Sequence, residues 1–332
     1  MKKNKMRLAA AMAMAAMMIS MAGCGNTSQT DEPAADDSAD AKTYNVGIMQ
    51  LVEHPALDAA TQGFQDKLKE LLGDSVTFDV QNAQGESTNC TTIATKFVSG
   101  DVDLIMANAT GAVQAAAAAT ADIPIVGTSV TDFKTAGVVD SNEAPGRNVT
   151  GVSDLTPIDE QMKLLQQVCP DAKKVAIVYC SAEPNSIFQS ELAQKALTEA
   201  GIEFKEYTAA DSNEIQAVIT NAVSECDVVF IPTDNTMASN MEIVKNVTVP
   251  AGVPVFAGEE GMCASGGLAT LSISFYDLGQ KAGEMAYEIL VNGADPATTP
   301  IGYVSDNIVP KYNAEIAEAL GITMPEGFEA IQ

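Results

Sequence analysis

The sequence lacks tryptophan and contains a single histidine, His54, among its 332 residues. Without tryptophan there is no indole ring to stack on a sugar. One histidine, with no cluster of histidine and cysteine around it, gives no reason to expect a metal site. The nucleophile-elbow, phosphate-loop and zinc-protease motifs are also missing. These absences argue against an enzyme and against a bound cofactor.

Positive charge is scarce as well. The chain has 18 lysines and arginines against 44 aspartates and glutamates, which gives a net charge of −26. A surface this acidic repels nucleic acid and anionic lipid, so we expect no nucleic-acid partner. The chain has six cysteines, and no pair of them has C-x-x-C spacing. We therefore expect free thiols rather than a disulfide framework.

The N-terminal segment has the pattern of a secretory signal with a lipoprotein processing site. It begins with four basic residues, Lys2, Lys3, Lys5 and Arg7. The apolar run Leu8 to Ala22 follows, and small residues stand directly before Cys24. We expect residues 1–23 to be removed, Cys24 to carry a lipid, and residues 24–42 to form a flexible acidic tether. The alternatives are a transmembrane anchor and a plain cleaved signal.

From residue 43 onward, short β-branched runs alternate with helical patterns. In the first half, strands are predicted at 44–50, 76–80, 104–107 and 123–127, and helices at 55–72, 87–98 and 110–120. After a crossing segment at 146–156, helices are predicted at 157–168, 185–200, 212–223, 236–247 and 276–291, and strands at 174–179, 203–207, 228–231, 254–257 and 268–273. Two copies of one α/β plan predict two lobes, each with a parallel, doubly wound sheet.

Ligands of open parallel sheets bind beyond the carboxyl ends of the strands. The predicted strand ends carry small polar and acidic side chains, several of which also begin helices. The candidate ligand-binding residues are Gln50, Glu53, His54, Thr110, Gly111, Thr128, Ser129, Thr131, Asp132, Asn185, Ser186, Asp234, Asn235, Glu259 and Ser274. Each has a simpler interpretation as a helix cap or turn residue. What favours a site is their convergence on one cleft between two lobes.

Five segments resemble the tryptophan/tyrosine-type substrate-binding lipoproteins of ABC transporters. They are VGIMQLVEHPALD (46–58), NVTGVSD (148–154), PTDNT (232–236), AGEEGM (257–262) and GGLAT (266–270). The resemblance implies a type I periplasmic-binding-protein fold, with two Rossmann-like lobes joined by a three-strand hinge. It places residues 43–152 plus 275–296 in the N-terminal lobe and residues 153–274 plus 297–332 in the C-terminal lobe. Members often carry aspartate where this chain has Ser274.

This resemblance implies an extracytoplasmic solute receptor, monomeric and anchored to the membrane, that delivers a small molecule to an ABC permease. The expected ligand is an aromatic or other neutral amino acid. A carboxylate such as Glu53, Asp132, Asp234 or Glu259 would hold its ammonium group, and Thr128, Ser129 or Thr131 its carboxylate. Two alternatives stay open: a lipid-anchored sensor for a signalling receptor, and a sugar or nucleoside receptor of the same fold.

Overall fold

Strands and helices alternate along the chain, and the strands sort into two separate sheets. The computed structural model describes residues 42–304 and 308–331. The predicted signal segment, Cys24 and the tether up to residue 41 lie outside the described residues. Within the described part, no helix is long and apolar enough to cross a membrane.

The first sheet has six described strands in the order β11-β5-β4-β3-β1-β2. All of its pairings are parallel. The strands are β1 (Tyr44–Gln50), β2 (Val76–Asn82), β3 (Leu104–Asn108), β4 (Ile125–Val130), β5 (Val149–Ser153) and β11 (Gly302–Tyr303). Its helices are α1 (Pro55–Leu72), α2 (Ser87–Ser99), α3 (Thr110–Ala119) and α10 (Phe275–Asn292).

The second sheet has seven described strands in the order β13-β12-β10-β9-β8-β6-β7. The strands are β6 (Lys174–Cys180), β7 (Glu203–Ala209), β8 (Val228–Ile231), β9 (Val255–Ala257), β10 (Ala269–Ser272), β12 (Val309–Tyr312) and β13 (Glu329–Ala330). The β10–β12 pairing is antiparallel. The helices are α4 (Ile158–Val168), α5 (Pro184–Ala200), α6 (Ile215–Glu225), α7 (Asn235–Ala238), α8 (Met241–Ala251), α9 (Glu260–Ser265) and α11 (Ala314–Leu320).

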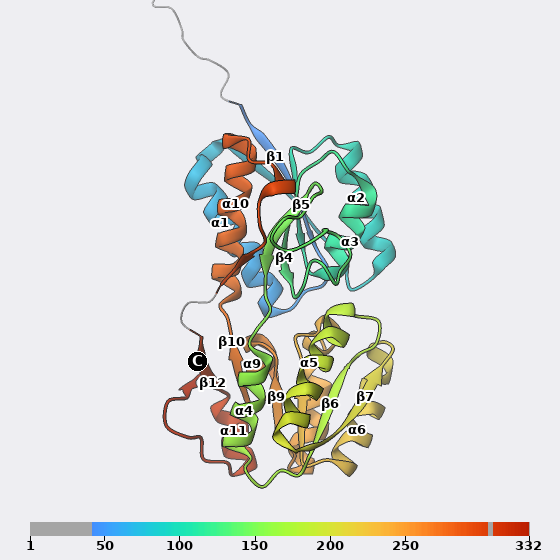
Figure 1. The fold of residues 1–332 in the computed structure, drawn as a ribbon, viewed down its shortest axis with the longest axis vertical. Coiled ribbons are helices and arrows are strands. Elements are labelled where there is room, and N and C mark those ends of the chain that lie inside the picture. The colour runs from blue at the N-terminus through green and yellow to red at the C-terminus, as the bar shows by residue number, and fades with distance from the viewer. Residues whose placement is uncertain (1–41, 305–307, 332) are drawn as a thin grey trace, which may run out of the picture. The chain divides into compact units, whose positions relative to one another are not determined.

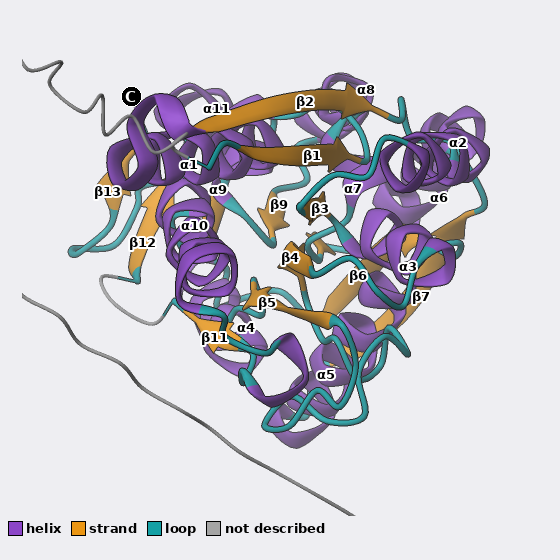
Figure 2. Cartoon of the chain, turned by 90° about the horizontal axis from the view of Figure 1, so that it is seen from above, coloured by secondary structure: helices purple, strands orange, loops and turns teal. Residues whose placement is uncertain are grey.

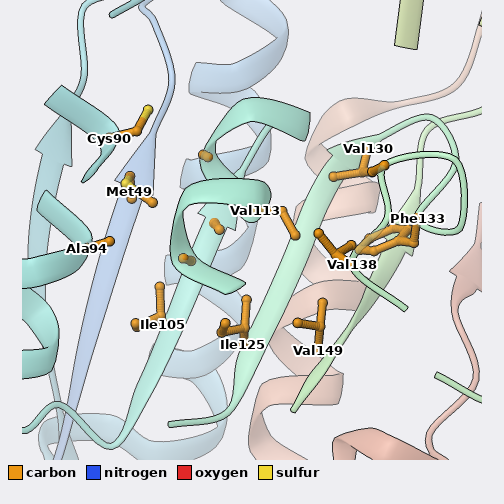
Figure 3. Packing of buried hydrophobic residues seen from close by; sticks show 14 of the residues in the cluster. Met49, Cys90, Ala94, Ile105, Val113, Ile125, Val130, Phe133, Val138 and Val149 are labelled. Atoms are coloured by element: carbon orange, nitrogen blue, oxygen red, sulfur yellow. The ribbon is translucent and has the colours of Figure 1, made fainter. Parts of the chain in front are cut away.

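Each sheet is buried on both faces, as parallel sheets require. In the first lobe, α1 and α10 cover one face and α2 and α3 the other, as Figures 1 and 2 show. Figure 3 shows Ile105, Ile125 and Val149 side by side on three neighbouring strands, in the same apolar cluster as Val113 of α3. In the second lobe, two apolar clusters likewise lie on opposite faces of the sheet. The predicted α/β class with two parallel-dominated sheets is confirmed.

The chain crosses between the sheets after β5, after β10 and after β11. The third crossing contains residues 305–307, which the structure does not describe, so the predicted hinge can be followed at two crossings. Gln161 of α4 forms hydrogen bonds to residues beside both of these crossings. Its Nε2 donates to Thr156 Oγ1 at 3.0 Å, to the Gly258 carbonyl at 3.1 Å and to the Leu271 carbonyl at 2.9 Å. The predicted lobe boundaries stay a prediction, although β11 pairs with β5 and so brings part of 297–332 to the first sheet.

Two elements differ from the sequence-based prediction near the strand ends. The helix predicted over 236–247 is two helices, because side chains compete for the carbonyls of its first turn. Ser239 Oγ donates to the Asn235 carbonyl at 2.6 Å, and Asn240 Nδ2 donates to the Thr236 carbonyl at 2.8 Å. Strand β4 runs to Val130 instead of ending at Gly127, with a shift of register against β5.

Helices α1 and α10 approach each other unusually closely through glycine. A Cβ on Gly279 would lie 2.0 Å from the Ala60 carbonyl oxygen, and one on Gly63 would lie 2.1 Å from the Tyr276 carbonyl oxygen. Real Cβ atoms cannot come this near backbone, so any larger residue forces the helices apart. This contact fixes α10, which enters from the second sheet, against the first lobe.

We predict that Gly279→Ala lowers the free energy of unfolding by about 1–3 kcal/mol, because the added methyl overpacks the helix interface. Urea unfolding followed by circular dichroism measures this loss. Glu284→Ala, an exposed change on the same helix, serves as control and should cost less than about 1 kcal/mol. Equal unfolding midpoints for the two variants would contradict the close-packing account.

Candidate functional site

The carboxyl ends of both sheets meet at the boundary between the lobes, where polar side chains are buried. Two side-chain hydrogen bonds cross this boundary. His54 Nε2 lies 3.3 Å from Asn235 Oδ1, and Gln189 Nε2 donates to Thr131 Oγ1 at 3.2 Å. All four residues are buried. The two lobes therefore enclose the strand ends between them.

In the first lobe, two hydroxyl groups at the end of β4 have no hydrogen-bond partner among the described residues. They are Thr128 Oγ1 and Ser129 Oγ, and both residues are buried. Ser129 has a left-handed backbone with φ of 55°, which interrupts the register of β4 and turns its side chain. The N-terminus of α3 lies beside them, since the Ala109 N–H donates to the Thr128 carbonyl at 3.0 Å. Free N–H groups of the first turn, at Thr110 and Gly111, favour an anion here.

Two carboxylates lie nearby, on either side of the hinge. Asp154 follows β5, and its N–H donates to the Val130 carbonyl at 3.2 Å. Glu259 follows β9 and caps α9, accepting from the Met262 N–H at 2.6 Å. Both side chains are buried, and Asp154 Oδ1 has no hydrogen-bond partner within the described chain.

Burial makes these carboxylates hard to ionise. It raises the pKa of Asp154 to about 6, against a smaller opposing effect of Thr131. Burial also raises the pKa of Glu259 to about 7; the N–H groups of Gly261 and Met262 oppose this, and the Asp154 carboxylate adds to it. No ion pair among the described residues includes Asp154 or Glu259. An ion in low dielectric is strongly destabilised without a partner, so this spot favours an incoming cation.

Asp234, which the sequence suggested as a ligand contact, has its acceptor atoms occupied by its own lobe. Its Oδ1 accepts from the Met237 N–H at 2.8 Å, and its Oδ2 accepts from the Cys180 N–H at 2.7 Å and from Ser186 Oγ at 2.8 Å. Burial and then the Glu183 carboxylate raise the pKa of Asp234. Asp234 thus joins α7 to β6 and, through Ser186, to α5, and the capping interpretation fits Asp234.

Several other predicted residues are also engaged within one lobe. Gln50 binds Thr61, Asp58 and the Val52 carbonyl. Asp132 accepts from the Thr135 N–H at 2.6 Å and from Asn142 Nδ2 at 2.7 Å. Ser274 is exposed and caps α10.

Asn185 donates to the Thr233 carbonyl at 3.1 Å, within the second lobe. Glu53 is exposed and lines a cavity of about 510 Å³ between the lobes, together with His54 and Lys245. These residues shape the boundary, and their role in ligand binding stays a prediction.

Sequence reasoning missed four boundary residues: Asp154, Gln161, Glu183 and Gln189. Asp154 lies inside one of the segments that resembled the transporter lipoproteins, and its position after a strand was the available signal. Gln161 and Gln189 lie within helices, where polar residues usually face water, so their burial could not be expected from spacing.

Comparison with known proteins agrees with this geometry. Residues 45–330 match the sequence model of a family described as ABC transporter substrate binding protein. The chain belongs to this family. A curated relative, the "Tyrosine-binding protein" of Clostridioides difficile, is 40% identical over 286 residues, which cover 84% of this chain and 83% of the relative. The resemblance expected from the sequence is confirmed, as is a binding protein rather than an enzyme.

Solved structures show the same architecture. The "ABC domain in complex with L-Trp" from Streptococcus pneumonia has a TM-score of 0.84 at 34% identity, covering 87% of this chain and 100% of that one. The "conserved domain protein" from Vibrio cholerae also has a TM-score of 0.84 at 34% identity, and the match covers 88% of this chain and 100% of that one. Members of the family serve membrane permeases from outside the cytoplasm, so the predicted small-molecule ligand, permease partner and extracytoplasmic location follow from membership.

A third family structure reports on lobe closure. It is the "ligand-free, open structure" of a Clostridium difficile substrate-binding protein, with a TM-score of 0.68 at 38% identity, covering 87% of this chain and 99% of that one. This open structure has the higher sequence identity to the chain, 38% against 34% for the L-Trp complex. The L-Trp complex nevertheless has the higher TM-score, 0.84 against 0.68. The described lobes are therefore arranged more like the ligand-bound relative, in accord with the hydrogen bonds across the boundary.

We predict that Asp234→Ala destabilises the ligand-free protein by about 2–4 kcal/mol, because it removes a helix cap and leaves buried donors unpaired. Thermal and urea unfolding without ligand measure this. Asp211→Ala removes an exposed cap, whose oxygen accepts from the Asn213 N–H at 2.8 Å, and should cost about 1 kcal/mol. Weaker ligand binding by Asp234→Ala at unchanged stability would instead make Asp234 a ligand contact.

Proposed function

We propose that this protein captures a free amino acid with an aromatic side chain between its lobes and delivers it to an ABC permease from a lipid anchor at Cys24. The observation that carries the proposal is the pair of buried carboxylates, Asp154 and Glu259, without a cationic partner in the described chain. A zwitterion supplies the missing charge and needs an anion site close by.

The ammonium half of the ligand fits beside Asp154. Its Oδ1 is buried and has no partner among residues 42–304 and 308–331, and an ammonium group would donate a charge-assisted hydrogen bond to it. Glu259 adds negative electrostatic potential at the same place, although backbone N–H groups already donate to both of its oxygens. In this assignment Asp154 takes the role of the aspartate that relatives often carry at the position of Ser274. Serine at 274 is therefore compatible with an amino acid ligand.

The carboxylate half fits at the end of β4. Thr128 and Ser129 offer two unpaired hydroxyl donors, and the first turn of α3 offers N–H groups with a favourable helix dipole. Strands β4 and β5 are neighbours, and Val130 pairs with Ser153 directly before Asp154. The two charged ends of an amino acid would thus bind to adjacent strand ends.

The aromatic side chain is inferred from relatives. One relative is named a tyrosine-binding protein, and one solved relative holds L-Trp. A sugar or nucleoside lacks the ammonium that the buried acids favour. A lipid-anchored sensor would use the same site and differs only in its membrane partner.

A panel of ligands read by thermal shift tests the proposal. L-Tyrosine, L-tryptophan or L-phenylalanine at about 100 times its dissociation constant should add about 2.7 kcal/mol of stability. The melting temperature should then rise by several degrees in a protein of this size. A rise with a sugar or a nucleoside and none with any amino acid would overturn the amino acid assignment.

Asp154→Asn is the matched variant for the same assay. It should weaken amino acid binding at least tenfold while raising the stability of the ligand-free protein at pH 8. The folded-state pKa of about 6 lies above the ordinary value of 3.8, so the buried carboxylate costs up to about 3 kcal/mol above pH 6. Below pH 4 Asp154 is protonated in both the folded and the unfolded protein, so the substitution no longer raises the stability. Asp159→Asn, an exposed change in α4, controls for net charge.

The lipid anchor is tested by Cys24→Ala in the full chain. The unmodified protein should sediment with membranes and take up labelled palmitate, because a diacylated cysteine holds a protein stably at a bilayer. The variant should incorporate no label and appear in the soluble fraction. Retention of the variant at the membrane would favour the transmembrane-anchor alternative for residues 1–23.

A further inference from the structure

The single histidine of the chain bridges the two lobes. His54 directly precedes α1 in the first lobe, and Asn235 begins α7 in the second. His54 is 6% exposed, and its Nε2 lies 3.3 Å from Asn235 Oδ1. If the lobes separate, this hydrogen bond is lost and the ring reaches water. His54 therefore reports on closure.

Glu183 determines which way the Asn235 amide faces. Its Oε2 accepts from Asn235 Nδ2 at 2.8 Å and from the Asn235 N–H at 3.0 Å. Its Oε1 accepts from the Thr236 N–H at 2.8 Å and from Thr236 Oγ1 at 2.7 Å. With Nδ2 held by Glu183, the oxygen of the amide faces His54. The His54 ring must then donate from Nε2, and in the uncharged ring Nδ1 carries no proton.

A second proton on His54 would have no acceptor. Nδ1 is buried and has no hydrogen-bond partner among the described residues. The ring also stands at the positive N-terminal end of the 18-residue helix α1, which disfavours a cation. Protonation in the closed form would therefore bury an unpaired N–H at an unfavourable potential.

Charged groups around the ring act in both directions. Burial lowers the pKa of His54, while its bond to Asn235 and the carboxylates of Asp58 and Glu183 oppose this. Across the neighbouring cavity, α8 presents Glu242 and Lys245, and Glu53 lines the same space. The lowered pKa shows that burial outweighs the surrounding acids.

We propose that Glu183, Asn235 and His54 form a latch that stabilises the closed lobes only while His54 is uncharged, so that acidification releases the ligand. Glu183 acts as a positioning residue through Asn235. The inference rests on the proposed function in one respect, that the lobes close on a bound amino acid. In the open form His54 regains its ordinary pKa of about 6.5, so at pH 5.5 about ten open molecules in eleven are protonated. Binding should then weaken about tenfold relative to pH 7.5, since only the uncharged form can close.

Calorimetric titration of L-tyrosine at pH 7.5 and pH 5.5 tests the latch, with His54→Gln as the matched variant. Glutamine keeps an N–H donor for Asn235 and does not titrate. The affinity of each protein at pH 7.5 serves as its own reference, and the factor by which affinity falls between pH 7.5 and pH 5.5 should be about tenfold smaller in the variant. Asp154 and Glu259 titrate in both proteins, so their contribution cancels. Equal losses in the two proteins would overturn the latch.

Failure of the proposed function has a different signature, namely no heat with L-tyrosine, L-tryptophan or L-phenylalanine at either pH. Small-angle X-ray scattering then tests the latch with the compound that the thermal-shift panel identifies, held near its dissociation constant. The radius of gyration of the unmodified protein should increase between pH 7.5 and pH 5.5, and that of His54→Gln should not. Identical scattering changes in both proteins, or none in either, would contradict the proposal.

Discussion

Two carboxylates buried without a cation, Asp154 and Glu259, set the chemistry of the lobe boundary. A charge removed from water is unfavourable unless something compensates for it, and within the described chain no lysine or arginine pairs with either acid. In the proposed function the ammonium group of the ligand supplies this compensation, so the charge of the ligand favours closed lobes.

The polar groups at the strand ends fall into two sets. The side chains of the first set form hydrogen bonds within their own lobe and hold turns and helix ends in place. They are Gln50, Asp132 and Asp234. Thr128, Ser129 and Asp154 have buried polar atoms with no hydrogen-bond partner in the described part of the chain. Unpaired buried polar atoms are rare in folded proteins, and for this reason the second set is the one proposed to bind the ligand. The first set makes the second possible, because it keeps each strand end rigid.

The lobes can move as bodies because their interiors are independently packed. Two apolar clusters lie within each lobe, and the glycine contacts between α1 and α10 fasten the returning helix to the first lobe. Gln161 hydrogen-bonds beside two of the crossings between the lobes. In the proposed function the lobes close by bending at these crossings, and His54 then meets Asn235.

The sequence by itself determined the α/β plan, because period and β-branching act locally. Strand β1 and helix α1 lie where they were predicted, at Tyr44–Gln50 and Pro55–Leu72. It also indicated the family, which is confirmed, and it predicted a site at the carboxyl ends of the strands, since these ends share one edge of the sheet. Local signals could not separate a cap from a contact: Asp234 and Thr128 are both polar residues at strand ends, yet only Thr128 has a hydroxyl left free. Tertiary structure decided that difference, and the roles proposed for Asp154 and Glu183 rest on it as well, because hydrogen-bond satisfaction depends on neighbours far away in the chain.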